Sequence, residues 1–112
     1  MLRAYRLSKS EDFAALRKSG RSWSNKLLVL VIRPNGRETS RVGFVVSKRV
    51  GNAVVRNKIK RRLRETVRLR RIEGGWDLIL IARKGAPKVA FQEISSSVDS
   101  LFLRAGFHPS PW

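Results

Sequence analysis

A segment in the middle of the chain combines an apolar stripe with a dense run of positive charge. Its apolar side chains recur every four residues: Val55, Ile59, Leu63 and Val67, with Thr66 beside them. That spacing is typical of an amphipathic helix with one buried face. Asn52 is a suitable N-cap, and the pair Gly74-Gly75 a suitable end. The rest of the chain must therefore supply an apolar surface on which this helix packs.

The neighbouring face of the predicted helix is basic. It carries four cations and one amide, with a fifth cation at its border: Lys60, Arg61, Arg64, Arg68 and Asn57, with Arg56 at the border. Lys58 and Arg62 lie further round. Like charges four residues apart destabilise a free helix by roughly a few tenths of a kcal/mol per pair. Binding a polyanion would relieve that repulsion.

The positive charge of the chain is concentrated in this region. The 112 residues carry a formal net charge of +17, and residues 41–72 contribute 12 basic residues against one acidic residue. Such an excess favours a nucleic acid or an anionic membrane surface as partner. The alternative is that the charge serves only to keep the protein in solution. The longest apolar run, Leu27 to Ile32, is far short of the roughly 20 residues that span a bilayer. The chain has no cysteine, which excludes disulfides and thiolate metal sites.

The remaining pattern predicts one small α+β domain over residues 1–112, with an irregular tail from about residue 107. Strands are predicted at 27–32, 41–47 and 77–82, and Trp23 could begin a further short strand. The Pro34-Asn35-Gly36 turn suggests that the first two of these strands run antiparallel. Helices are predicted at 9–19, where Ser8 to Glu11 fits a capping box, and from residue 91 to Gly106. A sheet covered by helices on at least one face is the natural arrangement.

The sequence offers no catalytic residues and no metal ligands. The single histidine, His108, stands in a tail with prolines, where no partner or cleft is evident. The carboxylates show no metal-binding spacing, and Gly74-Gly75 lacks the Lys-Ser/Thr of a phosphate loop. A nuclease site made of protein groups is therefore not expected.

Two side-chain types could read nucleic acid rather than only attract it. Asn57 could contact a base edge or a ribose hydroxyl, or it could simply cap the helix. For the aromatic residues Phe13, Phe44 and Trp23 core packing is the default, and Phe13 is the best candidate among them for stacking on a base. Reading the basic helix as a DNA recognition helix would need a helix just upstream, where the sequence predicts a strand. RNA is therefore favoured over DNA.

Residues 50–64 read VGNAVVRNKIKRRLR and closely resemble the bacterial ribonuclease P protein component. The core of the resemblance is Arg-Asn-x-x-Lys-Arg, preceded by Gly-Asn-Ala-Val and by Val46-Ser47-Lys48-Arg49. It extends to residues 7–13, 41–43 and 77–83, and covers nearly the whole chain except the tail.

The resemblance implies a fold and a division of labour. The fold is an α+β sandwich of two layers in the order α-β-β-β-α-β-α, similar to a ribosomal-protein domain, with a left-handed βαβ crossover. In this family a large RNA uses Mg²⁺ to cleave precursor tRNA and free its mature 5′ end. The protein binds that catalytic RNA through the basic helix, and binds the 5′ leader of precursor tRNA in a cleft beside the first helix. It needs no cofactor of its own and acts in the bacterial cytoplasm, without membrane or DNA.

By position, the resemblance assigns RNA binding to residues of the loop and helix: Lys48, Arg49, Arg56, Asn57, Lys58, Lys60, Arg61, Arg64 and Arg68. It assigns Phe13 to the leader cleft. Arg17 and Val31 stand where some relatives have further aromatic residues, so Arg17 could contribute charge or planar stacking instead. From composition alone, a structural RNA-binding protein such as a small ribosomal protein is the alternative.

Overall fold

The computed structural model describes residues 5–7, 9–70, 72 and 74–107. Its elements, in chain order, are β1 (Tyr5–Arg6), α1 (Ser10–Ser19), β2 (Arg21–Ser24), β3 (Leu28–Pro34), β4 (Arg41–Val45), α2 (Ala53–Arg68), β5 (Trp76–Ala82), the short 3-10 helix η1 (Ala86–Lys88) and α3 (Phe91–Arg104). The predicted α+β order is confirmed, with the two-residue strand β1 and the turn η1 as additions. No helix in these described ranges is long and apolar enough to cross a membrane.

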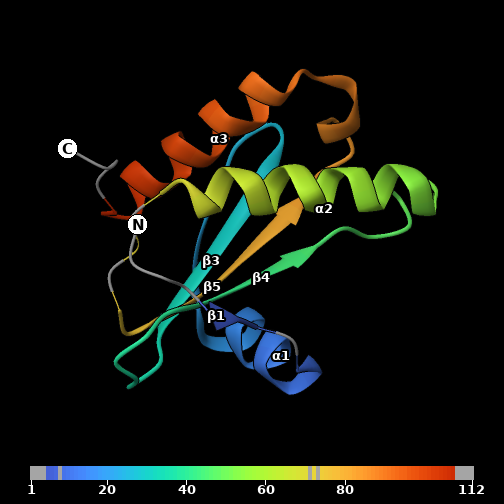
Figure 1. Cartoon of the computed structure of the whole chain (residues 1–112). Coiled ribbons are helices and arrows are strands. Elements are labelled where there is room, and N and C mark those ends of the chain that lie inside the picture. Colours follow the sequence, from blue (N-terminus) through green and yellow to red (C-terminus); the bar gives the residue numbers. More distant parts are fainter. Residues whose placement is uncertain (1–4, 8, 71, 73, 108–112) are drawn as a thin grey trace.

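The strands form one sheet in the order β1-β4-β5-β3-β2. β3 is antiparallel to β2 and β5, whereas β4 is parallel to β5 and β1. β3 and β4 run in opposite directions, as predicted, but they are not neighbours, because β5 lies between them (Figure 1). β5 is buried almost throughout and therefore belongs in the centre of the sheet.

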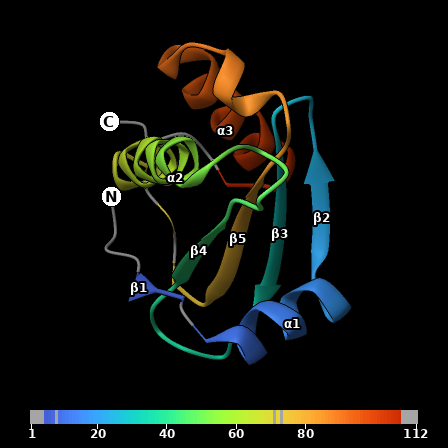
Figure 2. The ribbon, with the colours of Figure 1, turned by 90° about the vertical axis from the view of Figure 1, so that its right-hand side faces the viewer.

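Helices cover both faces of the sheet unequally. α2 and α3 pack side by side on one face, and α1 lies against the other (Figure 2). The larger core is between the sheet and the α2–α3 pair, and a smaller cluster around Leu16, Val31 and Ile79 lies under α1. Seen from the α2 side with β4 and β5 pointing upward, β5 lies to the left of β4, so the β4–α2–β5 crossover is left-handed.

The start of α2 agrees with the prediction and its end does not. The Asn52 side chain accepts a hydrogen bond from the Val55 backbone N–H at 3.0 Å, as an N-cap should. The helix ends at Arg68, however, and not at Gly74-Gly75. These glycines shape the turn into β5: Gly75 has a φ of +97°, and a Cβ on Gly74 would collide with the carbonyl oxygen of Glu38.

The two ends of the chain show smaller differences. The N-cap of α1 is Lys9, which makes no side-chain capping bond, so the helix does not begin as the capping box at Ser8 predicts; Ser8 itself lies outside the described residues. Gly20 follows α1 and donates its N–H to the Leu16 carbonyl, as a helix stop would. Phe107, at the start of the predicted tail, is buried against Trp76 and Phe102. His108 lies outside the described residues.

Candidate nucleic-acid interface

The two faces of α2 are separated as the sequence pattern predicts. The buried residues of the helix are Ile59, Leu63, Thr66 and Val67, which are members of the predicted apolar stripe. Thr66 satisfies its hydroxyl by donating to the Arg62 carbonyl at 2.8 Å. Burial of this stripe against the sheet and α3 fixes the rotation of the helix, and so decides which side chains face outward.

Most side chains assigned to RNA binding lie on the surface. Seven are exposed: Lys48, Arg49, Asn57, Lys58, Arg61, Arg64 and Arg68. Two are half-buried: Arg56 and Lys60. Among these nine, and within the described part of the chain, only Arg68 forms an ion pair, at 2.8 Å from the exposed Glu65. The face therefore keeps nearly all of its positive charge available for an external anion.

Arg56 and Asn57 differ from the surrounding cations. The Arg56 Nε atom is buried and has no hydrogen-bond partner in the described structure, although a buried N–H normally has one. Asn57 is exposed, and the capping role that the sequence left open for it belongs to Asn52. Its amide thus remains available to donate to and accept from a ligand.

A groove of about 840 Å³ lies between α1, β4 and α2. Its lining residues come from all three elements or the chain just after β4: Ser10, Phe13, Ala14, Arg17, Lys18, Phe44, Val45, Val46 and Lys60. A smaller hollow of about 200 Å³ shares Phe13, Phe44 and Lys60 and adds Arg6 and Arg64. Both residues assigned to the leader cleft, Phe13 and Arg17, therefore lie in one groove.

The groove combines an aromatic surface with cations, and the backbone of β4 makes room for the ring. A Cβ atom on Gly43 would lie 2.5 Å from Cζ of Phe13, so the phenyl ring rests directly on this glycine. The ring is half-buried and keeps a side toward the groove. An exposed aromatic face beside Arg and Lys side chains is suited to a single-stranded nucleic acid, because bases stack on the ring and phosphates pair with the cations.

Sequence reasoning missed several members of the groove. Phe44 was expected in the core, and it does pack partly there, but it also lines the groove. The pairing of β1 with β4 reaches only Arg41 and Val42, which leaves Phe44 beside the groove. Lys60 and Arg64 were assigned only to the helix face. Their place in the groove depends on how α1 and α2 sit on the sheet, for which no local sequence signal exists.

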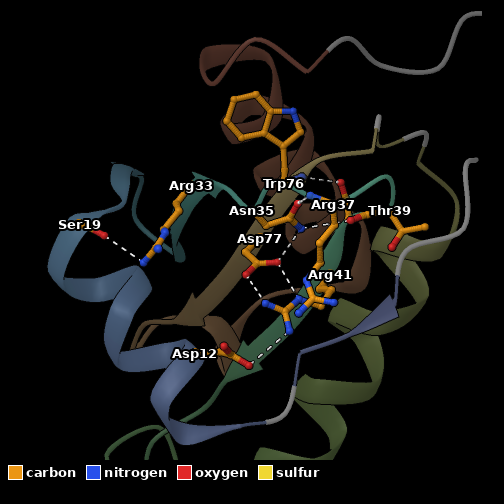
Figure 3. Close-up of polar contacts among 10 residues, drawn as sticks. Asp12, Ser19, Arg33, Asn35, Arg37, Thr39, Arg41, Trp76 and Asp77 are labelled. Carbon is orange, nitrogen blue, oxygen red and sulfur yellow. Dashed lines mark hydrogen bonds and ion pairs between the residues drawn. The ribbon is translucent and has the colours of Figure 1, made fainter.

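A partly buried ion-pair network lies under the first turn of α1 (Figure 3). Arg41 donates through Nε and Nη2 to the two carboxylate oxygens of Asp77, at 2.9 and 2.6 Å, and through Nη1 to Asp12 at 3.4 Å. Asn35 donates to the same Asp77 carboxylate at 2.9 Å. Burial acts to raise the pKa of Asp77, but the hydrogen bonds from Arg41 and Asn35, together with the positive charges of Arg41 and Arg37, outweigh it, and the pKa lies below its ordinary value. Asp77 is thus held as an anion.

The acidic side chains near the site are few or already hydrogen-bonded in the part of the chain that the structure describes. Within the described ranges there is no group of three or more His, Asp or Glu side chains that could hold a metal ion. The Asp77 residue is 6% exposed, and its carboxylate is occupied by Arg41 and Asn35. What the arrangement offers is a binding surface: a basic helix face joined to an aromatic groove through Lys60 and Arg64.

Comparison with known proteins gives a consistent result along the chain. Residues 1–106 match the family model described as Ribonuclease P. A ribonuclease P protein component from Roseiflexus castenholzii is 48% identical over 109 residues, covering 95% of this chain and 89% of that protein. One from Clostridium kluyveri is 44% identical over 108 residues, covering 93% and 96%.

Solved structures agree with the sequence comparison. The RNase P protein of Staphylococcus aureus superposes with a TM-score of 0.83 at 34% identity, over 94% of this chain and 98% of that chain. The RNase P protein of Thermotoga maritima gives 0.81 at 35% identity, over 88% and 96%. Sequence and fold thus lead to the same assignment, and the chain belongs to the ribonuclease P protein family.

Proposed function

We propose that this chain is the protein subunit of a ribonucleoprotein that removes the 5′ leader from precursor tRNA in the bacterial cytoplasm. The basic face of α2, with Lys48 and Arg49, binds the catalytic RNA. The groove beside α1 binds the leader. Cleavage itself is carried out by the RNA with its Mg²⁺ ions, a division of roles that membership of the ribonuclease P protein family supports.

The observation that carries this proposal is the junction of the two surfaces. Lys60 and Arg64 belong to the basic helix face and also line the hollows that contain Phe13. A substrate strand in the groove would therefore lie directly beside an RNA bound along α2. Such an arrangement suits a protein that positions one RNA against another, as the family assignment implies.

Binding of the catalytic RNA by the helix face is tested by Arg61→Ala. Arg61 is exposed, has no ion-pair partner in the described structure and does not line the groove. Because each lost phosphate contact lowers the slope of log K against log salt by about 0.7–0.9, the variant is expected to bind the catalytic RNA more weakly and with a flatter salt dependence. The measurement is a salt titration of affinity.

Arg104→Ala provides the matched control for that titration. It also removes one exposed arginine, but from the last turn of α3, where its Nη1 donates to the Ser24 carbonyl at 2.7 Å. Its slope is expected to equal that of the unmodified chain. An Arg61→Ala slope that equals the control slope would remove Arg61 from the RNA interface.

A further inference from the structure

The helix that carries Phe13 is held to the sheet by few contacts. Of the ten residues of α1, only Leu16 is fully buried, in the small cluster with Val31 and Ile79. At the C-terminal end, Arg33 donates to the Ser19 hydroxyl at 3.1 Å, and Gly20 packs closely on Val31. The last turn of α1 is therefore fixed both by apolar packing and by a hydrogen bond.

The first turn of α1 is attached differently. Among the described residues, its one side-chain bond to the sheet is the contact between Asp12 Oδ2 and Arg41 Nη1, at 3.4 Å (Figure 3). Asp12 directly precedes Phe13, and its side chain is 25% exposed. Besides the packing of Phe13 on Gly43, the attachment of this turn thus depends on where the Arg41 guanidinium is held.

The Arg41 side chain is held in place by Asp77. Its Nε and Nη2 atoms form a two-pronged bond to Asp77, whose side chain is only 9% exposed. Bidentate pairs of this kind have a defined geometry, unlike a pair made by a lysine ammonium. The third nitrogen, Nη1, therefore points toward Asp12 from a fixed position on β4, two residues before the glycine on which the Phe13 ring rests.

We propose that Arg41 is a positioning residue for the groove: anchored on Asp77, it holds Asp12 and so fixes the first turn of α1 with the Phe13 ring across Gly43. The inference rests on the proposed role of the groove in binding the leader. Arg41 does not line the groove, so it acts on the leader only through the placement of α1. Loss of the Asp12 contact leaves the ring less ordered and the groove less complementary to a stacked base.

The test compares Asp12→Ala with Glu11→Ala in the assembled ribonucleoprotein. Both variants remove one carboxylate from the first turn of α1, so both lose the same helix-dipole interaction and gain the same charge toward RNA. Of these two carboxylates, only that of Asp12 bonds to Arg41. The readout is the ratio of the affinities for precursor and mature tRNA, which does not depend on the folded fraction of a preparation.

Asp12→Ala is expected to lower this ratio by roughly three- to tenfold, because small displacements of a binding group are costly, while Glu11→Ala leaves it unchanged. Loss of a negative charge alone would strengthen the binding of both RNAs in both variants. Loss of the contact with Arg41 instead weakens the binding of precursor tRNA, so the two effects have opposite signs. Equal ratios for Asp12→Ala and Glu11→Ala would overturn the proposal.

A second pair of variants separates geometry from charge. Arg41→Lys keeps the positive charge but loses the planar fork that bonds both oxygens of Asp77 and directs a third nitrogen at Asp12, so it is expected to lower the ratio as Asp12→Ala does. Arg70→Lys is its control, because Arg70, two residues after α2, also bonds a carboxylate, that of Asp99 in α3 at 2.6 Å, away from the groove. A normal ratio for Arg41→Lys would contradict a positioning role.

Phe13→Ala, measured in the same series, tests the leader groove separately from the positioning role of Arg41. If Phe13→Ala lowers the ratio and Asp12→Ala does not, the positioning role of Arg41 is wrong and the leader groove stands. If Phe13→Ala leaves the ratio unchanged, both are wrong. If Phe13→Ala lowers it and adding Asp12→Ala lowers it no further, the two residues act as one unit, which supports the proposal.

Discussion

Phe13→Ala is expected to weaken binding of precursor tRNA by roughly 1–3 kcal/mol, about 5- to 150-fold, while binding of mature tRNA is unchanged. The expectation follows from the position of the ring, which rests on Gly43 and faces a groove with Arg17 and Lys60 on its walls. A base that stacks on the ring contributes only when a leader is present. The measurement is equilibrium binding of the two RNAs to the assembled ribonucleoprotein.

Phe91→Ala is the appropriate control for that measurement. Phe91 is 39% exposed at the start of α3, outside the groove, so its loss removes a surface phenyl ring of the same size. Neither RNA is expected to bind differently. Equal losses of affinity for precursor and mature tRNA in Phe13→Ala would assign this ring to core packing alone.

Leu63→Ala is expected to lower the free energy of unfolding by about 2–5 kcal/mol. Leu63 is fully buried in the main core, where it faces the sheet and α3 from the middle of α2. Removing most of its side chain leaves a cavity that the rigid sheet beneath cannot fill. Denaturant unfolding monitored by circular dichroism measures the change.

The exposed leucine at the end of the same helix is the control for this experiment. Leu69 is 66% exposed, so Leu69→Ala is expected to change the unfolding free energy by less than about 0.5 kcal/mol. A comparably small loss for Leu63→Ala would show that α2 is not anchored by its apolar stripe. The outward direction of its basic face would then have no structural basis.

The properties of α2 were largely predictable because they are local. A period of four places Ile59 and Leu63 on one face whatever the partner surface is, and a side chain such as Asn52 caps a helix by bonding within three residues. The helix end was not predictable in the same way. Arg70 donates to the Thr66 carbonyl and to Asp99 of α3. This tertiary contact lies just after the last residue of α2, well before the two glycines.

The arrangement of the sheet was less accessible to sequence reasoning. The Pro34-Asn35-Gly36 turn indicated a hairpin, but the Asn35 N–H bonds to the Gly75 carbonyl, just before β5, and β5 takes the place beside β3. Period and turn signals identify strands without specifying which strands pair. The two-residue strand β1 is too short to give any periodic signal.

The residues of the groove were also predictable to different degrees. Phe13 and Arg17 were assigned to it by resemblance and do lie in it, whereas Phe44 was expected only in the core. The sequence around an aromatic residue in a strand does not show whether part of its ring lines a groove after folding. Lys60 lines the groove because α1 and α2, on opposite faces of the sheet, both reach the end of β4 that β1 does not cover, which depends on contacts between segments distant in the sequence.

The central claim is that this chain positions RNA while a partner RNA performs the cleavage. Its most direct test is cleavage of precursor tRNA at low Mg²⁺ by a bacterial catalytic RNA, with and without the full chain, and by the chain alone. We expect the chain to stimulate release of the leader by the RNA at the mature 5′ end, and to cleave nothing by itself. Absence of stimulation, or cleavage by the purified chain without RNA, would contradict this account.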